Sequence, residues 1–274
     1  MGAFLILSPS KTWPSTPLPD CLSDGNNTQS LNIETAGVDA VLDGDTFTIE
    51  SGQDIRLAGI RAPKHLASGA TLRTAPYANI AQTFLTDLLT DKSISVVPGT
   101  QRRDRYDRIV GQVLVRPRRS ESFWLQEYLL QAGMARVDLS LHDQACGSAL
   151  FAAEQTARQR RQGLWASSFY RIRQHDDLED VFGTFELVEG TVLDVAHRRN
   201  RYFLNFGADW REDFTITIPP NFARSFTKKL NPMTLNGRKV RVRGWVESYN
   251  GPFIEAAHPG QIEIIDEKPK IAPF

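Results

Sequence analysis

Carboxylates and guanidinium groups come together in three short segments of the chain. They are Asp43-Gly44-Asp45-Thr46, the run 56–64, and the run 104–108. Carboxylate oxygens are ligands for hard divalent cations, and arginines hold phosphate through paired hydrogen bonds, so these residue types point to phosphate chemistry. Each segment alone is weak evidence, because Asp-Gly-Asp is also a common hairpin turn in which glycine supplies a positive φ.

The three segments are expected at the turns and ends of short strands. Apolar runs predict strands at 38–42, 47–50, 55–60, 94–97 and 109–115. Apolar residues at helical spacing predict helices at 77–89, 123–132 and 148–162, the second ending at Gly133 in a left-handed cap. Leu164 and Trp165 follow the third helix and are expected to plug the core. The first part of the chain is therefore predicted to be β-rich with three helices.

The chain has 274 residues, with 32 basic and 32 acidic side chains, which is typical of a globular protein and argues against a disordered one. Length and polar stretches predict a flexible lead at 1–37, a first domain at 38–165, a linker at 166–181, a second domain at 182–267 and a tail at 268–274. In the second domain, five strands with a helix between the third and fourth predict an OB-type barrel.

The order and spacing of the motifs carry a family resemblance. They are Asp43-Gly44-Asp45-Thr46, then Arg56-Leu57 leading to a turn at Pro63, then Asp104, Tyr106 and Arg108, and finally helices that end before Leu164-Trp165. Over about residues 38–165 the chain resembles the staphylococcal nuclease (thermonuclease) family. The resemblance implies a β-rich α+β fold, an OB-like five-stranded barrel with three helices, and Ca²⁺-dependent hydrolysis of DNA and RNA phosphodiesters.

The resemblance also assigns roles to four residues. Asp45 matches the first calcium ligand of the family, and Asp43 matches a supporting carboxylate. Arg56 and Arg108 match the two arginines that hold the phosphate and stabilise its developing charge. These four side chains are therefore the first candidates for a functional site.

The rest of the family machinery has been replaced. Arg61 stands where the family has its second aspartate, and Ala62 stands where a threonine donates its carbonyl. Lys64 stands where the family has its general-base glutamate. Asp107 replaces the glycine before the second arginine, and aspartate tolerates a left-handed backbone better than most residues.

These replacements change the charge of the predicted site. Asp45, Arg56, Arg61, Lys64 and Arg108 carry a formal net charge of +3. Such a site attracts phosphate and repels Ca²⁺, and neither arginine nor protonated lysine offers a lone pair to a metal. No cofactor is therefore expected, although the family would use Ca²⁺, and Asp43 and Asp45 are interpreted as vestiges of a metal site.

The sequence favours a protein that binds nucleic acid, DNA or RNA, or another phosphate-bearing polyanion, through Arg56, Arg61, Lys64 and Arg108, with weak or absent metal-dependent hydrolysis. One alternative is an active, metal-independent phosphodiesterase in which Arg56, Arg108 and Lys64 are catalytic and Lys64 acts as a base. A second alternative is a non-catalytic protein-interaction scaffold. In a third interpretation, Arg61 and Lys64 simply point into solvent.

The densest positive region is a hairpin, and it predicts a nucleic-acid contact. It contains Arg102, Arg103, Arg105 and Tyr106, with Arg116, Arg118 and Arg119 on the returning strand. Tyr106 and Trp124 are candidates to stack on a base. The alternative is a solvated hairpin in which Asp104 and Asp107 form salt bridges with the arginines.

In the second domain, Lys239, Arg241 and Arg243 alternate with apolar residues and share one face of a predicted strand. That face is interpreted either as a surface for single-stranded nucleic acid or as an outward, solubilising face. His197 and His258 have no partners at metal spacing and receive no role.

The two cysteines, Cys21 and Cys146, either pair in an oxidising compartment or remain free thiols. No apolar run approaches the ~20 residues of a membrane span, and no signal peptide is visible. The location is left open, including an extracytoplasmic one, and the sequence does not indicate an oligomeric state.

Overall fold

The computed structural model describes residues 18–23, 33–65, 75–118, 121–139, 146–209 and 211–266. The chain divides into two compact units. The first comprises Met1–Val137 and His142–Trp165, and the second comprises Asp138–Leu141 and Ala166–Phe274. Most of the lead predicted at 1–37, Arg119 and the tail predicted at 268–274 lie outside the described residues.

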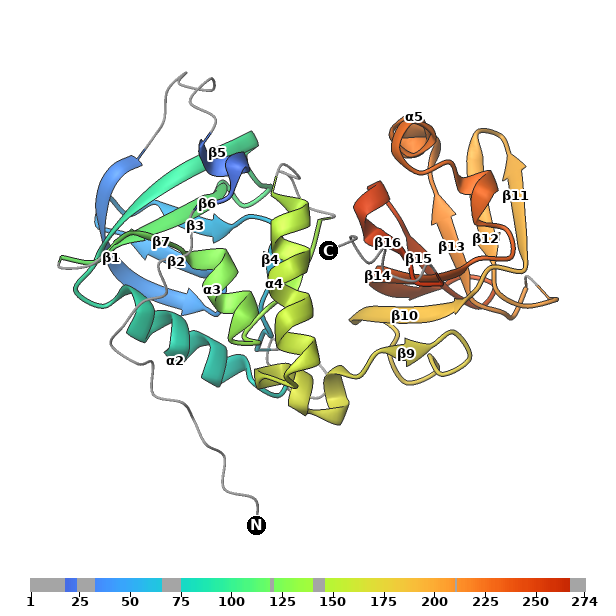
Figure 1. Ribbon diagram of the computed structural model, residues 1–274, viewed down its shortest axis with the longest axis horizontal. Coiled ribbons are helices and arrows are strands. Elements are labelled where there is room, and N and C mark those ends of the chain that lie inside the picture. Colours follow the sequence, from blue (N-terminus) through green and yellow to red (C-terminus); the bar gives the residue numbers. More distant parts are fainter. Residues whose placement is uncertain are drawn as a thin grey trace, which may run out of the picture. The chain divides into compact units, whose positions relative to one another are not determined.

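Five strands of the first unit form a ring (Figure 1). They are β1 (Ile33–Asp43), β2 (Thr46–Ile49), β3 (Asp54–Leu57), β5 (Ser93–Arg103) and β6 (Ile109–Arg116). Antiparallel pairs join β1 to β2, β2 to β3, β5 to β6 and β1 to β5, and the parallel pair β3–β6 closes the ring. This arrangement confirms the β-rich α+β class predicted for this part of the chain.

The helices of the first unit are α1 (Asp20–Ser23), α2 (Ala78–Leu89), α3 (Leu125–Gln131) and α4 (Gly147–Gln159), followed by the short helix η1 (Gly163–Ala166). Helix α2 packs against β1, and α3 packs against β6 and α4 (Figure 1). Short strands β4 (Ile60–Arg61) and β8 (Arg136–Val137) form a separate pair, and β7 (Phe123–Trp124) pairs with β6.

The ends of these helices follow from local residues. Gly133 has a φ of 65°, so α3 ends at the left-handed glycine that the sequence predicted. Residues 123–124, expected as the start of that helix, instead form β7 because they pair with β6. Leu164 has no exposed surface, as a core plug requires, whereas Trp165 is only partly buried.

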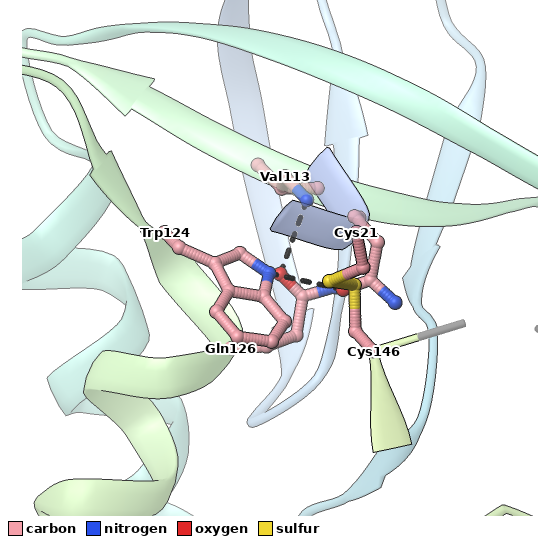
Figure 2. Close-up of a disulfide and its surroundings, with 6 residues drawn as sticks. Cys21, Val113, Trp124, Gln126 and Cys146 are labelled. Carbon is pink, nitrogen blue, oxygen red and sulfur yellow. Dashed lines mark hydrogen bonds between the residues drawn. A yellow bond between two sulfur atoms is a disulfide. The ribbon is translucent and has the colours of Figure 1, made fainter. Parts of the chain in front are cut away.

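A disulfide joins Cys21 of α1 to Cys146, the residue immediately before α4, with Cα atoms 5.4 Å apart. Figure 2 shows the bond beside the side chains of Trp124 and Gln126. The Gln126 side chain accepts a hydrogen bond from Val113 N at 3.1 Å and donates one to Gly111 O at 2.9 Å. Of the two interpretations that the sequence left open for the cysteines, the structure has the paired one.

The second unit contains β9 (Arg173–Gln174), β10 (Phe185–Thr191), β11 (Asp194–Arg198), β12 (Arg201–Asn205), β13 (Thr215–Ile218), β14 (Lys239–Ser248), β15 (Pro252–Glu255) and β16 (Ile262–Ile264). Helix α5 (Pro220–Lys229) lies between β13 and β14 and buries Phe226 completely. Short helices are η2 (Ser168–Tyr170), η3 (Pro232–Leu235) and η4 (Pro259–Gln261). Among the helices of the described ranges, none has the length and apolar character needed to cross a lipid bilayer.

Strand pairing in the second unit runs β11–β12–β13–β15–β14–β10, with β13 and β15 parallel. Antiparallel pairs make up the rest of that path. The chain passes from β10 to β11 through only two residues, Val192 and Leu193. The core between the strands consists of residues such as Leu204, Ile216, Val242 and Ile254, none of which has exposed surface.

The two arginines of the basic face predicted on β14 fit neither of its interpretations, whereas Lys239 is exposed. Arg243 is 1% exposed and contacts Glu263 at 2.5 Å. Arg241 lies 2.5 Å from Glu189 and 3.3 Å from Glu263. Acidic side chains on the neighbouring strands β10 and β16 therefore neutralise these arginines, so they form neither a free surface for nucleic acid nor an outward solvated face.

Candidate phosphate-binding site

The turn between β1 and β2 builds the acidic part of the site. Gly44 leaves no room for a side chain, because an added Cβ would lie 2.7 Å from the Cβ atoms of both Ala62 and Ala81. Asp45 N donates a hydrogen bond to Asp43 Oδ1 at 2.9 Å, which closes the turn. The result is an Asp45 side chain with no exposed surface.

Both carboxylate oxygens of Asp45 are fully engaged. Oδ2 accepts a hydrogen bond from Ala62 N at 2.6 Å. Oδ1 lies 3.0 Å from Arg56 Nη1, and Thr46 Oγ1 donates to it at 3.1 Å. Oδ1 also contacts the ammonium group of Lys64. A buried carboxylate needs such partners to remain charged.

Lys64 lies between two carboxylates. Its Nζ is 2.6 Å from Asp43 Oδ1 and also contacts Asp45 Oδ1. The Lys64 side chain remains 31% exposed, so one side of it reaches solvent. The salt bridges of its ammonium group are thus with carboxylates.

The pKa values of Asp43 and Asp45 are shifted in opposite directions. Burial opposes the ionisation of Asp45, but the attraction of Arg56 and Lys64 outweighs it and holds the pKa of that carboxyl well below its usual range. Burial and the neighbouring charge of Asp45 raise the pKa of Asp43, and Lys64 only partly offsets this rise. Asp45 is therefore the permanent anion of the pair.

Arg56 is buried, and its guanidinium group donates hydrogen bonds to backbone carbonyls and pairs with Asp45. Its side chain is 5% exposed. Nη1 donates to Leu57 O at 3.0 Å, and Nη2 donates to Ile60 O at 2.9 Å, in addition to the ion pair with Asp45. This arginine connects β3 to the chain that leads into β4, and it fixes the position of Asp45.

Arg108 lies at the edge of the same cluster. Its Nε and Nη2 contact Asp104 Oδ2 at 2.8 and 2.6 Å, and its Nη1 is 3.5 Å from Thr46 Oγ1. Asp107 precedes it with a φ of 63°, which confirms that this aspartate adopts the left-handed backbone expected at a glycine position. The Arg108 side chain is 23% exposed.

Arg61 lies on the short strand β4, apart from the cluster around Asp45. It is in register with Arg136 of β8 and is partly exposed. The structure thus brings Asp43, Asp45, Arg56 and Lys64 into one cluster, with Arg108 next to Thr46 at its edge.

The basic hairpin contains both arginines and their acidic partners. Arg103 pairs with Asp107 at 3.1 Å, and Arg105 donates to the Tyr106 hydroxyl at 2.7 Å. Tyr106 is 63% exposed, and the guanidinium carbons of Arg105 and Arg108 lie 4.8 and 5.1 Å from its ring centre. Arg102 belongs to β5, but its side chain lies outside the described residues.

The proposed stacking role of Trp124 is wrong. Its side chain is 2% exposed, and its indole nitrogen donates to Gln112 Oε1 at 3.0 Å. The salt bridges that the alternative interpretation of the hairpin expected for Asp104 and Asp107 are present, to Arg108 and Arg103 respectively.

The residues of the cluster do not fit a calcium ion. Ca²⁺ takes six to eight oxygen ligands, whereas here the ammonium of Lys64 contacts both carboxylates that would supply them. The remaining oxygen of Asp45 accepts a backbone hydrogen bond. Nor do three or more His, Cys, Asp and Glu side chains gather into a metal-binding group anywhere in the described part of the chain.

The first unit combines a five-stranded ring, an Asp-Gly-Asp turn and two arginines beside that turn, the features on which the family resemblance rests. Residues 54–167 match the family model of the staphylococcal nuclease homologues. The chain therefore contains a staphylococcal-nuclease-like domain, as the motif order predicted.

Curated relatives agree with this assignment. The chain is 36% identical over 120 residues to a probable endonuclease LCL3 of Paracoccidioides lutzii, covering 40% of the chain and 33% of that protein. It is 31% identical over 150 residues to a probable endonuclease LCL3 of Phaeosphaeria nodorum, covering 52% of the chain and 47% of that protein. It is 24% identical over 141 residues to a thermonuclease of Staphylococcus hyicus, covering 50% of the chain and 79% of that protein. The chain thus spans a third to a half of the length of these fungal relatives.

Proposed function

We propose that the nuclease-like domain binds the phosphodiester backbone of nucleic acid through Lys64 and Arg108, without a divalent ion and with little or no metal-dependent hydrolysis. The observation that carries this proposal is the ammonium of Lys64 between Asp43 and Asp45. With Arg56 and Arg108, this cation balances Asp43, Asp45 and Asp104 in formal charge, and part of the Lys64 side chain remains exposed to solvent. The similarity to proteins named endonuclease and thermonuclease supports nucleic acid as the ligand class.

Lys64 and Arg108 are the cations of the cluster that a ligand can reach. They are 31% and 23% exposed, against 5% for Arg56. Asp104 holds Arg108 through Nε and Nη2, so Nη1 is directed toward Thr46 and the cluster. A phosphate at this edge would accept hydrogen bonds from Nη1 and from Lys64 Nζ while both retain their acidic partners.

Arg56 has a supporting role in this proposal. Because its donors are committed to Asp45 and to backbone carbonyls, it positions the turn and does not contact the ligand. Arg61 is assigned no phosphate contact. Arg103, Arg105 and Tyr106 extend the site along the hairpin, where the exposed Tyr106 ring can stack on an unpaired base.

We also infer that the second unit is an OB-type barrel, over about 182–267, joined to the nuclease-like domain at 38–165 by the segment 166–181. The strand path β11–β12–β13–β15–β14–β10 and the parallel pair β13–β15 support this inference. So does the place of α5 between β13 and β14.

The test measures the binding of a fluorescent single-stranded oligonucleotide to the full chain. Fluorescence anisotropy gives the affinity, once in EDTA and once in Ca²⁺. Lys64→Met and Arg108→Gln should each weaken binding about tenfold, because each removes a phosphate contact. Arg160→Gln is the matched control, since Arg160 is an exposed arginine at the end of α4. It should change the affinity less than about twofold.

The same samples separate the alternatives. Equal loss of affinity in all three variants would mean that net charge, not this site, drives binding, and would overturn the proposal. Cleavage that requires Ca²⁺ would overturn its metal-free part. Cleavage that persists in EDTA and disappears in Arg108→Gln would instead establish a metal-independent phosphodiesterase.

A further inference from the structure

The basic residues of the second unit are unevenly placed. Residues 182–267 contain eleven basic and eleven acidic side chains. Six of the basic residues lie in two short segments without any acidic residue, namely the turn between β11 and β12 and the helix α5. They are Arg198, Arg199, Arg201, Arg224, Lys228 and Lys229, and we call this set the basic end.

The fold brings these two segments to the same end of the unit. Tyr202, just after the turn, pairs with Ile218, the last residue of β13, and α5 begins two residues later at Pro220. Helix α5 also packs against β12, the strand that leaves the turn. Figure 1 shows α5 and the β11–β12 turn at the same end of the strands.

Several residues of the basic end differ in their ion pairing from the arginines elsewhere in residues 182–267. Arg211, Arg238, Arg241 and Arg243 each contact an acidic side chain within 3.7 Å. Within the basic end, Arg201 contacts Glu255 at 3.2 Å. Arg199, Arg224, Lys228 and Lys229 are exposed, and no acidic contact is found for them among the described residues. Their positive charge is therefore open to a ligand.

The turn between β11 and β12 places an exposed arginine, Arg199, in a left-handed backbone conformation that is unfavourable for this residue type. Arg199 and Asn200 have φ values of 49° and 61°, the left-handed pair of a type I′ hairpin turn. Asparagine, aspartate and glycine are favoured at the first of these positions, so arginine is a poor choice for stability alone. An unfavourable residue at such a turn is consistent with a binding role.

The turn also offers an aromatic surface. The rings of His197 and Tyr202 stack with centroids 4.2 Å apart and an angle of 10° between their planes. Tyr202 is 8% exposed, whereas His197 is on the surface. The outer face of the His197 ring is thus available to a planar group, as in proteins that stack unpaired bases.

We propose that the basic end is a second binding site for single-stranded nucleic acid, separate from the Lys64–Arg108 site. Phosphates lie along Arg199, Arg224 and Lys228, and a base stacks on His197. A lipid surface fits less well, because interfacial helices need exposed apolar side chains, whereas Phe226 of α5 is fully buried and the exposed residues of the helix after Pro220 are polar. This site does not depend on the function proposed for the first domain.

The experiment measures binding of a labelled 20-nucleotide oligo-dT strand to the full chain between 50 and 200 mM NaCl. It uses a chain that also carries Lys64→Met and Arg108→Gln, so that the first domain does not contribute. In that background, Arg199→Gln/Lys228→Gln should weaken binding about tenfold and lower the salt slope by about 1.4, near 0.7 for each single-strand phosphate contact.

The control of equal charge is Arg171→Gln/Arg211→Gln, two exposed arginines of the same unit that pair with Asp177 and Asp209. It should change binding less than about twofold. Equal losses in both pairs, or no loss in either, would overturn the proposal. So would polyglutamate that competes as well as oligo-dT, because it would mean an acidic protein partner.

Base stacking has its own readout. The chain should bind oligo-dT more tightly than an abasic strand of the same length, and His197→Ala should remove that preference while leaving the salt slope unchanged. A preference that survives His197→Ala would refute the stacking part of the proposal. If the first-domain variants abolish all binding while the basic end is intact, the second site is disproved and the first-domain proposal stands.

Discussion

The ammonium group of Lys64 contacts the carboxylate of Asp45, a side chain with no solvent-exposed surface. The same ammonium lies 2.6 Å from Asp43. A covalently attached cation therefore occupies the contacts that these two aspartates would offer to a metal ion. Arg56 completes the neutralisation of Asp45 from the other side.

Reversing the charge of two replaced residues should create calcium dependence. In Arg61→Asp/Lys64→Glu, a carboxylate replaces the Lys64 ammonium in the cluster and a second one stands at position 61 on β4, so the oxygen donors available to Ca²⁺ increase. We expect its melting temperature to rise with Ca²⁺, by an amount equivalent to about 1.4 kcal/mol at ten times the dissociation constant. Differential scanning calorimetry with and without EDTA measures this.

The neutral variant Lys64→Met provides the comparison for that experiment. The unsubstituted chain and Lys64→Met should show no calcium-dependent shift beyond about 1 °C, because neither has a third carboxylate in the cluster. Similar shifts in all three proteins would indicate weak ion binding elsewhere and would argue against the interpretation of the cluster.

Asp45→Asn should be strongly destabilising. The substitution leaves the buried Arg56 guanidinium without its anion, and breaking a buried pair from one side costs about 3–5 kcal/mol. Urea denaturation monitored by tryptophan fluorescence gives the change in free energy of unfolding. Asp45→Asn/Arg56→Met should lose less than the sum of the two single substitutions, and additive losses would show that the pair is not coupled.

Reduction of the Cys21–Cys146 disulfide should lower stability by about 2–4 kcal/mol, because the bond closes a loop with a sequence separation of 125 residues. Structural disulfides of this kind are retained in oxidising compartments. The measurement is chemical unfolding of Cys21→Ser/Cys146→Ser beside the oxidised chain. Unchanged unfolding midpoints, with and without reductant, would contradict a structural role.

Because of His258, the free energy of unfolding of the second unit should depend on pH. Burial, and secondarily Lys229, lowers its pKa to about 4, while Nδ1 accepts a hydrogen bond from Gly260 N at 3.0 Å. Between pH 6.5 and 4 the unfolded chain binds the extra proton, so the free energy of unfolding should fall by about 1–3 kcal/mol as the pH drops through this window.

The matched variant for this effect is His258→Asn, which can still accept the Gly260 hydrogen bond but cannot titrate. It should flatten the dependence between pH 7 and 5, measured as the urea midpoint at each pH. An identical pH profile for both proteins would assign the loss of stability to other groups.

Much of the first unit was predictable because local patterns and tertiary structure agree there. Gly133 ends α3, Asp107 takes a left-handed backbone, and β2, β3, β5 and β6 overlap the predicted apolar runs. Apolar periodicity misassigned Phe123 and Trp124 as helix because it carries no information about their pairing with β6. Strand β1 also begins earlier than expected, at Ile33, because that residue pairs with Val96 of β5.

The sequence predicted which residues belong to the candidate site better than it predicted their contacts. Counting charges over five residues gave +3, but the count left out Asp43 and Asp104, which contact Lys64 and Arg108. The alternation along β14 suggested free arginines, whereas their partners Glu189 and Glu263 lie far away in sequence. The contacts of Glu189 and Glu263 are tertiary, so residue spacing alone cannot reveal them, whereas Asp104 lies only four residues from Arg108.

The most direct test of the account compares the chain in EDTA and in millimolar Ca²⁺, with calorimetric titration of Ca²⁺ and a single-stranded DNA binding and cleavage assay on the same preparation. Our expectation, because Lys64 contacts both aspartates, is no stoichiometric Ca²⁺ binding, an unchanged affinity for the oligonucleotide and no calcium-stimulated product. Tight binding of one Ca²⁺ per chain together with cleavage that EDTA abolishes would contradict it.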